Sequence, residues 1–212
     1  MNAILATDFP LPSCLDPFAS PNAHRRHRIG RIDLDPRAID RFNLLLESVG
    51  GTPWTLDADR LATAARELRL CSISGIAPPC IRQRLRRVKA AVAMVADRNW
   101  QAAEDAVSVV RLVARYIAAD DDLIPDAEPA YGRLDDAIVV QAAWPRVANE
   151  VLAYVDFRRL RRIATAPGDL RARFDRSAWM QARRDEAALL AQRLGVRERS
   201  YVSRPATLFR IH

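Results

Sequence analysis

Apolar residues recur every three or four positions along most of this chain, which is the spacing of helices that bury one face. The first clear example is the segment from residue 36 to residue 51. Asp35 and Pro36 open it as an N-cap and a first helical residue, and Gly50-Gly51 closes it. Its predicted buried face consists of Ile39, Phe42, Leu45, Leu46 and Val49.

The same periodicity predicts helices further along the chain. One runs from about residue 57 to 70. The next is opened by Pro78-Pro79 and runs to about residue 97. Asn99 is expected to cap a fourth helix, and Asp135 or its neighbour a fifth. Pro145 should kink or restart this fifth helix, because proline removes a backbone hydrogen bond. A last long helix is expected from about residue 169 to 194, with Gly195 as its stop.

We therefore predict an all-α fold of about six helices in a compact bundle, with a central helix–acidic turn–helix hairpin. Only residues 200–212 have some strand character. Residues 1–31 are rich in proline and are expected to form an extended or disordered leader. An N-terminal helical portion follows at 32–98, the hairpin at 99–166, and a long helix with a tail at 167–212. One compact domain is expected from residue 32 onward.

The composition adds a strong excess of arginine. Half of the 212 residues are hydrophobic, which is enough for a sizeable core, and the formal net charge is +7. Lys89 is the only lysine among 33 basic residues. Arginine binds phosphate through two parallel hydrogen bonds, although a GC-rich genome explains the same bias. Two runs of basic residues are candidate phosphate-binding faces, and both runs are also typical of the solvated face of a helix. Their candidate residues are Arg82, Arg86 and Lys89 in one, and Arg158 and Arg162 in the other.

The chain carries no pattern of a secretory signal and no long uncharged apolar run. Its three cysteines, Cys14, Cys71 and Cys80, lack Cys-x-x-Cys spacing, so we expect reduced thiols rather than a disulfide framework. The expected location is the cytoplasm.

An acidic turn separates the fourth and fifth predicted helices. The segment from Asp120 to Asp136 contains seven acidic residues. Pro125 disfavours helical geometry at the residue before it, so the preceding helix must end there. Leu123 and Ile124 are expected to anchor the turn to the core, and Gly132 to allow a positive φ. Asp126 fits an Asx-turn or a cap, and Asp135 and Asp136 stand where the next helix should begin.

The residues from Tyr116 to Asp136, YIAADDDLIPDAEPAYGRLDD, resemble the signature of the YkvA family, a bacterial domain of unknown function. Its members typically show a helix that ends in Tyr, then Ser-Pro-Ile-Asp-Leu-Ile-Pro-Asp, then Ile-Pro-Val, a Gly and Leu-Asp-Asp. The resemblance implies a small helical hairpin without an assigned activity. The matching residues are Tyr116, Asp122, Leu123, Ile124, Pro125, Asp126, Pro129, Gly132, Leu134, Asp135 and Asp136.

Three charged residues depart from that signature. Asp120 and Asp121 replace the usual Pro-Ile, and Glu128 replaces the usual Ile before the second proline. Family members often have a hydrophobic hairpin that suits a membrane. A charge costs about 2.5–3.5 kcal/mol near the centre of a bilayer. We therefore do not expect membrane association for this chain.

The acidic turn also offers a possible metal site if the hairpin folds back on itself. Asp122, Asp126, Asp135 and Asp136 would supply the hard oxygen ligands that Mg²⁺, Mn²⁺ or Ca²⁺ prefers. The turn is not an EF-hand loop, and no histidine lies nearby. Helix capping and pairing with arginine account for the same residues, so our first expectation is that the protein has no cofactor.

No residue is predicted to be catalytic, because the sequence has no glycine-rich nucleotide motif, no phosphate-binding loop and no Gly-x-Ser-x-Gly. The first interpretation is a non-enzymatic protein-interaction or regulatory module that binds a protein partner or itself. One alternative is an arginine-rich nucleic-acid-binding protein. The other is a metal-dependent hydrolase that uses the four aspartates named above.

Overall fold

The computed structural model describes residues 9–16, 26–72, 76–119, 122–126, 128, 130–164 and 174–202. Within these ranges the chain is all-α, as predicted, with six α-helices, one short 3-10 helix and one small β-hairpin. The chain divides into two units, Met1–Asp156 and Phe157–His212, and the predicted boundaries after residues 98 and 166 do not coincide with this division. No helix of the described ranges is long and apolar enough to span a bilayer.

Helix α2 (Pro36–Gly50) forms where the pattern predicts it, and the predicted residues close its ends. The side chain of Asp35 accepts a hydrogen bond from the backbone N–H of Arg37 at 3.0 Å. Gly51 has a φ of 76°, in the left-handed region, and its N–H donates to the carbonyl of Glu47. The local signals of capping and chain reversal were therefore sufficient to place this helix.

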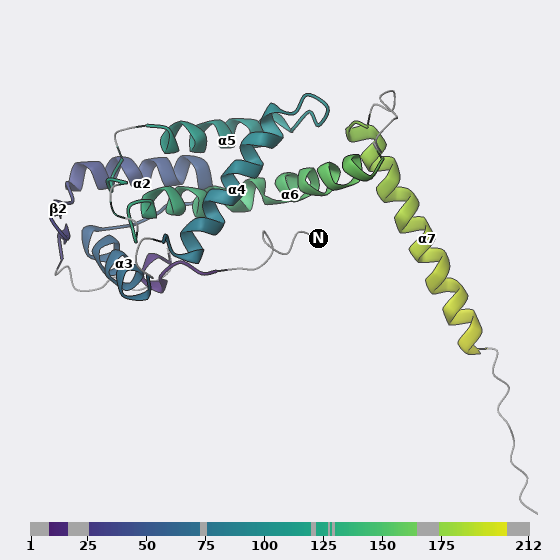
Figure 1. Cartoon of the computed structure of the whole chain (residues 1–212), viewed down its shortest axis with the longest axis horizontal. Coiled ribbons are helices and arrows are strands. Elements are labelled where there is room, and N and C mark those ends of the chain that lie inside the picture. The colour runs from purple at the N-terminus through teal and green to yellow at the C-terminus, as the bar shows by residue number, and fades with distance from the viewer. Residues whose placement is uncertain are drawn as a thin grey trace, which may run out of the picture. The chain divides into compact units, whose positions relative to one another are not determined.

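Helices α3 (Ala58–Cys71) and α4 (Pro79–Ala96) also follow the predicted ranges. Helix α5 (Glu104–Ile117) packs against both α4 and α2, as Figure 1 shows. Helix α6 (Leu134–Ala164) supplies much of the core of the first unit. Nine of its first ten residues are buried and the other, Gln141, is half-buried, so this end of α6 has no solvated face.

The prediction that Asn99 caps the fourth helix is wrong, because α5 begins only at Glu104. A turn precedes it, in which the backbone N–H of Trp100 donates to the carbonyl of Asp97 at 3.0 Å. The Trp100 side chain is fully buried, and its indole N–H donates to Glu150 on α6 at 3.0 Å. Burial of this indole holds the chain in the turn, so the helix starts after it.

Pro145 does not restart the fifth helix, because α6 runs without a break from Leu134 to Ala164. A proline inside a helix costs about 3 kcal/mol. Apolar residues are buried on both sides of the proline, among them Ala142, Ala143, Val147 and Val151. Their packing against the rest of the first unit outweighs that cost.

The last helix also differs from the prediction. Helix α7 (Arg176–Val202) passes through Gly195, which was expected to stop it, and includes residues 200–202, which were expected to have strand character. Residues 169–173 and 203–212 lie outside the described residues. Within the second unit, the rings of Phe157 and Phe174 stack with their centroids 5.7 Å apart.

The described parts of the predicted leader are structured, so the prediction of an extended or disordered segment is wrong for them. The 3-10 helix η1 (Ser13–Leu15) packs on α3 and buries Leu15. Strand β1 (Arg28–Ile29) pairs antiparallel with β2 (Ile32–Asp33). The leader buries apolar side chains against the helices, which a count of prolines did not reveal.

The arginine run of α4 is also less exposed than expected. The Arg84 side chain is 1% exposed and donates to the carbonyls of Phe9 and Cys80 and to the side-chain oxygen of Gln141. Arg87 is buried as well, and its guanidinium lies 4.5 Å from the centre of the Trp144 ring. These two arginines stabilise the interior of the first unit and do not belong to a solvated face.

Candidate functional site

The acidic turn is held by one buried carboxylate at the start of α6. The Oδ2 atom of Asp135 accepts a hydrogen bond from the hydroxyl of Tyr116 at 2.9 Å. The same oxygen accepts the backbone N–H of Ile124 at 3.1 Å. Asp135 and Ile124 are almost completely buried. This carboxylate therefore joins the end of α5, the turn and the first turn of α6.

A second carboxylate lies beside it with fewer partners. Asp136 is 3% exposed, and its Oδ1 atom has no hydrogen-bond partner within the described part of the chain. The nearest cation is Arg133, whose guanidinium lies 3.9 Å from Oδ2 of Asp136. Arg133 makes a closer ion pair, 2.8 Å long, with Asp126. The expected pairing of the turn with an arginine is thus present.

Burial raises the pKa of both adjacent carboxyl groups. The pKa of Asp135 rises to about 6, because desolvation outweighs the hydrogen bonds from Tyr116 and Ile124 that favour its charged form. The pKa of Asp136 rises to about 7, because the negative charges of Asp135 and Asp126 add to desolvation. Burial, followed by the charge of Asp135, also raises the pKa of Tyr116, so its hydroxyl remains a donor at neutral pH.

The hairpin does bring the four candidate metal ligands into one neighbourhood. Asp122, Asp126 and Asp135 each lie close enough to raise the pKa of Asp136 through their charges. Their geometry does not form a ligand cage, because the described residues contain no group of three or more His, Cys, Asp or Glu side chains that could hold a metal ion. Among them, Asp135 is engaged by Tyr116 and Ile124, and Asp126 by Arg133.

Gly132 is required for space and not for the predicted positive φ. The described glycines with positive φ are Gly30 and Gly51. A Cβ atom on Gly132 would lie 2.7 Å from the carbonyl oxygen of Glu128 and 2.8 Å from the backbone of Asp126. Its N–H also donates to the Glu128 carbonyl at 2.7 Å. The backbone folds back on itself here too closely for any side chain.

The other residues of the motif have separate places. Leu134 is the first residue of α6 and is fully buried, so Asp135 and Asp136 lie in the first turn and not at the predicted N-cap position. Leu123 is half-buried, and Pro125 is exposed. Pro129, together with the unusual Asp120 and Asp121, lies outside the described residues.

An open groove of about 440 Å³ lies between α2 and α5 and ends at the acidic turn. Phe42 and Tyr116 line it, and their rings pack with centroids 5.6 Å apart. The half-buried side chains of Leu45, Leu112 and Leu123 add further apolar surface. The groove and the acidic turn thus share Tyr116, whose ring lines the groove while its hydroxyl donates to Asp135.

Two exposed arginines also line this groove, Arg41 on α2 and Arg115 on α5, and the half-buried Asp122 lines its end at the acidic turn. In the described part of the chain neither guanidinium makes a hydrogen bond or an ion pair. Sequence reasoning did not single them out. The available signal was their spacing, since Arg41 stands four residues before Leu45 and Arg115 three after Leu112, at the edge of each apolar stripe.

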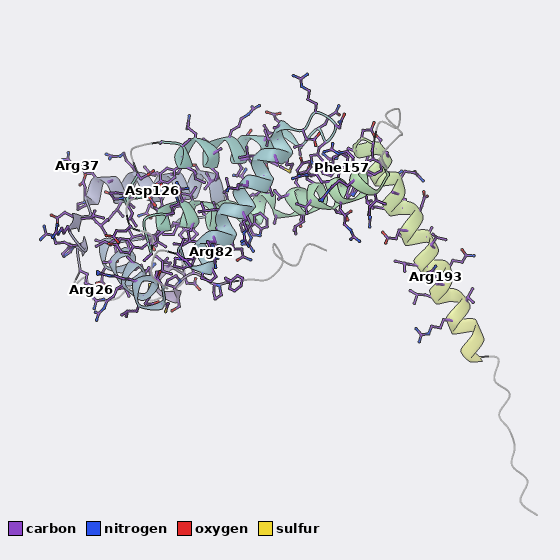
Figure 2. All side chains as sticks on the ribbon, viewed as in Figure 1. Arg26, Arg37, Arg82, Asp126, Phe157 and Arg193 are labelled. Atoms are coloured by element: carbon purple, nitrogen blue, oxygen red, sulfur yellow. The ribbon has the colours of Figure 1, made fainter. Side chains whose placement is uncertain are left out.

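The predicted phosphate-binding residues are exposed but belong to different units. Arg82, Arg86 and Lys89 lie on α4 in the first unit, and Arg158 and Arg162 follow residue 156 on α6. Figure 2 labels Arg26, Arg37 and Arg82 on the first unit. These three come from three different segments, so the basic residues are not confined to one helix.

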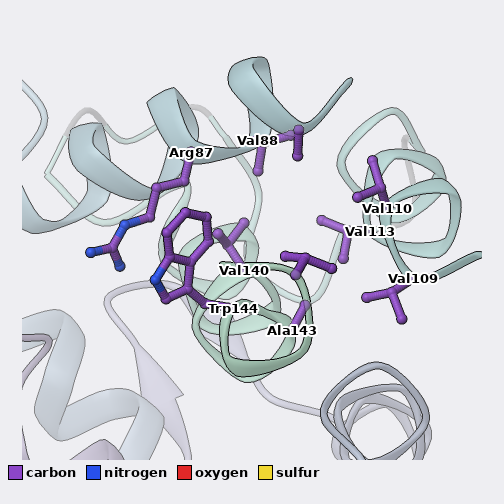
Figure 3. A pocket seen from close by; sticks show the side chains of 10 residues that line it. Arg87, Val88, Val109, Val110, Val113, Val140, Ala143 and Trp144 are labelled. Atoms are coloured by element: carbon purple, nitrogen blue, oxygen red, sulfur yellow. The ribbon is translucent and has the colours of Figure 1, made fainter. Parts of the chain in front are cut away.

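A second, much smaller cavity of about 20 Å³ lies between α4, α5 and α6. Figure 3 shows Val88, Val113 and Val140 around it, with Arg87 stacked on Trp144 at its edge. It leaves room inside for about one water-sized sphere. This cavity is an imperfection of core packing and has too little space for an organic ligand.

The sequence and fold of the chain stand apart from known proteins. No protein-family model, no curated protein and no solved structure gives a significant match to it.

Proposed function

We propose that this protein is a non-enzymatic interaction module of the YkvA-like type, and that the groove between α2 and α5 is the surface on which it binds a protein partner. One observation carries this proposal. The groove combines an apolar floor with two exposed arginines, Arg41 and Arg115, that have no intramolecular partner in the described part of the chain.

The chemistry of the acidic turn supports a binding role over a catalytic one. The hydroxyl of Tyr116 and the carboxylate of Asp135 bind each other, and the backbone N–H of Ile124 takes part in the same network. Asp126 is paired with Arg133. These groups hold the end of the groove in place, and their hydrogen bonds are directed into the protein.

The test uses a matched pair of neighbouring leucines on α2. Leu45 lines the groove, whereas Leu44 is 66% exposed and does not. Wild-type protein, Leu45→Glu and Leu44→Glu would be used for pull-downs from the native host, with thermal melts to verify folding. A partner retained by wild type and Leu44→Glu but lost by Leu45→Glu is the expected result. Equal recovery by the two variants would refute the groove as the binding surface.

A further inference from the structure

We infer that the partner segment is an acidic amphipathic α-helix, which lays an apolar stripe in the groove and places carboxylates against Arg41 and Arg115. The inference rests on the proposed function, because it names the chemistry of the occupant of the same groove. It is carried by the shape of the groove, its length and the placement of its charges.

The shape of the groove favours a helix over an extended peptide. Its lining residues belong to α2, to α5 and the residues that follow it, and to the acidic turn. No strand edge borders it among the described residues, so an extended peptide would find no ladder of backbone hydrogen bonds. A helix satisfies its own backbone groups and needs from the groove only apolar surface and polar contacts at the edges.

The length of the groove matches two turns of a helix. One wall spans 38–45 on α2, and the other runs from Leu112 on α5 to Ala119, just past the end of that helix. At about 1.5 Å per residue, the α2 wall is roughly 10 Å long. This is also the distance between positions i and i+7 of a bound helix, so apolar residues at i, i+3 or i+4, and i+7 would all reach the floor. Phe42, Leu45 and Leu112 are available to receive them.

The charges fix the polar character of the ligand. Arg41 lies on one wall and Arg115 on the other, each near the middle of its segment. A carboxylate on each flank of an apolar stripe would meet one arginine, and an arginine–carboxylate pair can form two parallel hydrogen bonds. A helix with basic flanks would place like charges together, so the groove discriminates against it.

The experiment is a selection of 16-residue peptides from a phage-displayed library on the full-length chain. Enriched peptides would be synthesised with a fluorescent label and titrated by anisotropy. We expect apolar residues at helical spacing, flanked by Asp or Glu. The double variant Arg41→Glu plus Arg115→Glu should weaken binding at least about tenfold, which corresponds to about 1.4 kcal/mol. Replacing the acidic flanks of the peptide by lysine should restore binding to this double variant.

The control exchanges the same charges on the same two helices outside the groove. Arg37 on α2 and Arg111 on α5 are exposed and do not line it, so Arg37→Glu plus Arg111→Glu should change affinity less than about threefold. If binding peptides require Leu45 but tolerate the change at Arg41 and Arg115, the acidic helix is wrong while the groove remains the binding surface. If no peptide depends on Leu45, the proposed function fails as well. Salt-dependent binding of single-stranded DNA through the two groove arginines, without peptide binding, would also overturn the inference.

Discussion

The acidic turn and the groove beside it lie next to each other and share Tyr116, but they use their charges in opposite ways. In the turn, the carboxylate of Asp135 is buried and bonded to groups of the same chain. In the groove, Arg41 and Arg115 are exposed and have no partner in the described part of the chain. Charged groups that are engaged internally stabilise the fold, whereas groups without internal partners are available for recognition. The sequence motif therefore marks a scaffold, and the proposed binding surface lies beside it.

The largest expected effect follows from removing the buried carboxylate of the turn. Asp135→Ala would leave the hydroxyl of Tyr116 and the backbone N–H of Ile124 buried without an acceptor. Each such group costs about 1–3 kcal/mol, so the free energy of unfolding should fall by roughly 3 kcal/mol. Urea denaturation at pH 5, below the pKa of about 6, measures the loss without the cost of the buried charge.

Asp135→Asn is the matched control for that experiment, because it keeps a side-chain oxygen that can accept both hydrogen bonds. It should recover most of the stability that alanine loses. Equal stability of the alanine variant and wild type would show that the turn is not held by this carboxylate, and the contrast between turn and groove would then disappear.

The next largest effect concerns Gly132, where space and not φ is limiting. Gly132→Ala would force a Cβ atom into backbone that lies 2.7–2.8 Å away. Overpacking of this kind costs about 1–3 kcal/mol, and we expect roughly 2 kcal/mol in urea denaturation. Substitution by asparagine distinguishes a lack of space from a need for positive φ, since asparagine tolerates a left-handed backbone. Gly132→Asn should be no better than alanine, whereas Gly51→Asn, at a φ of 76°, should be nearly neutral.

The comparison between Gly51 and Gly132 also shows what could be predicted from the sequence. The end of α2 depends on neighbours in sequence, so Asp35, Pro36 and Gly51 predicted it correctly. The anchoring of the turn by Ile124 was equally predictable, because Leu123 and Ile124 are the only large apolar residues between Asp120 and Ala130. The close approach of Gly132 to Glu128 arises only when the turn folds back, and glycine alone gives no indication of it.

Predictions failed where distant residues decide the outcome. Helix α5 does not start after Asn99, because the Trp100 side chain is buried and hydrogen-bonded to Glu150, which is 50 residues away in sequence. The basic run between Arg82 and Lys89 was described as typical of a solvated face, but Arg84 within it is hydrogen-bonded to Gln141 and to the backbone of Phe9. The groove was missed for the same reason. Its two walls come from α2 and α5, and only tertiary packing brings Arg41 and Arg115 to one site.

A third prediction uses pH to separate the two carboxylates of the turn. The folded-state pKa of Asp136 is about 7, above its ordinary value of 3.8. The folded protein therefore binds more protons than the unfolded chain between these two values, and the contribution of this group to stability is lost as the pH rises through about 7. Asp136→Asn removes this loss, so the variant should be more stable than wild type at pH 8 by roughly 1–2 kcal/mol.

Urea denaturation of wild type and variant from pH 4.5 to pH 8 measures the effect. The difference between the two proteins should grow with pH, because titration of all other groups largely cancels in the comparison. A difference that does not change with pH would mean that Asp136 is ionised without cost, and its unsatisfied Oδ1 atom would then have no energetic consequence.

The smallest expected effect is the change in stability when the charges of the two groove arginines are reversed. Arg41 and Arg115 are exposed and make no intramolecular pair in the described part of the chain, so Arg41→Glu plus Arg115→Glu should change the free energy of unfolding by less than about 0.5 kcal/mol. Arg133 provides the contrast within the turn, because it pairs with Asp126 at 2.8 Å and lies near the buried Asp136. Arg133→Glu should therefore lower stability by roughly 1 kcal/mol, since it adds a negative charge beside carboxylates. If reversing the groove arginines cost as much as reversing Arg133, those arginines would serve the fold, and their apparent availability for a partner would no longer distinguish the groove from the turn.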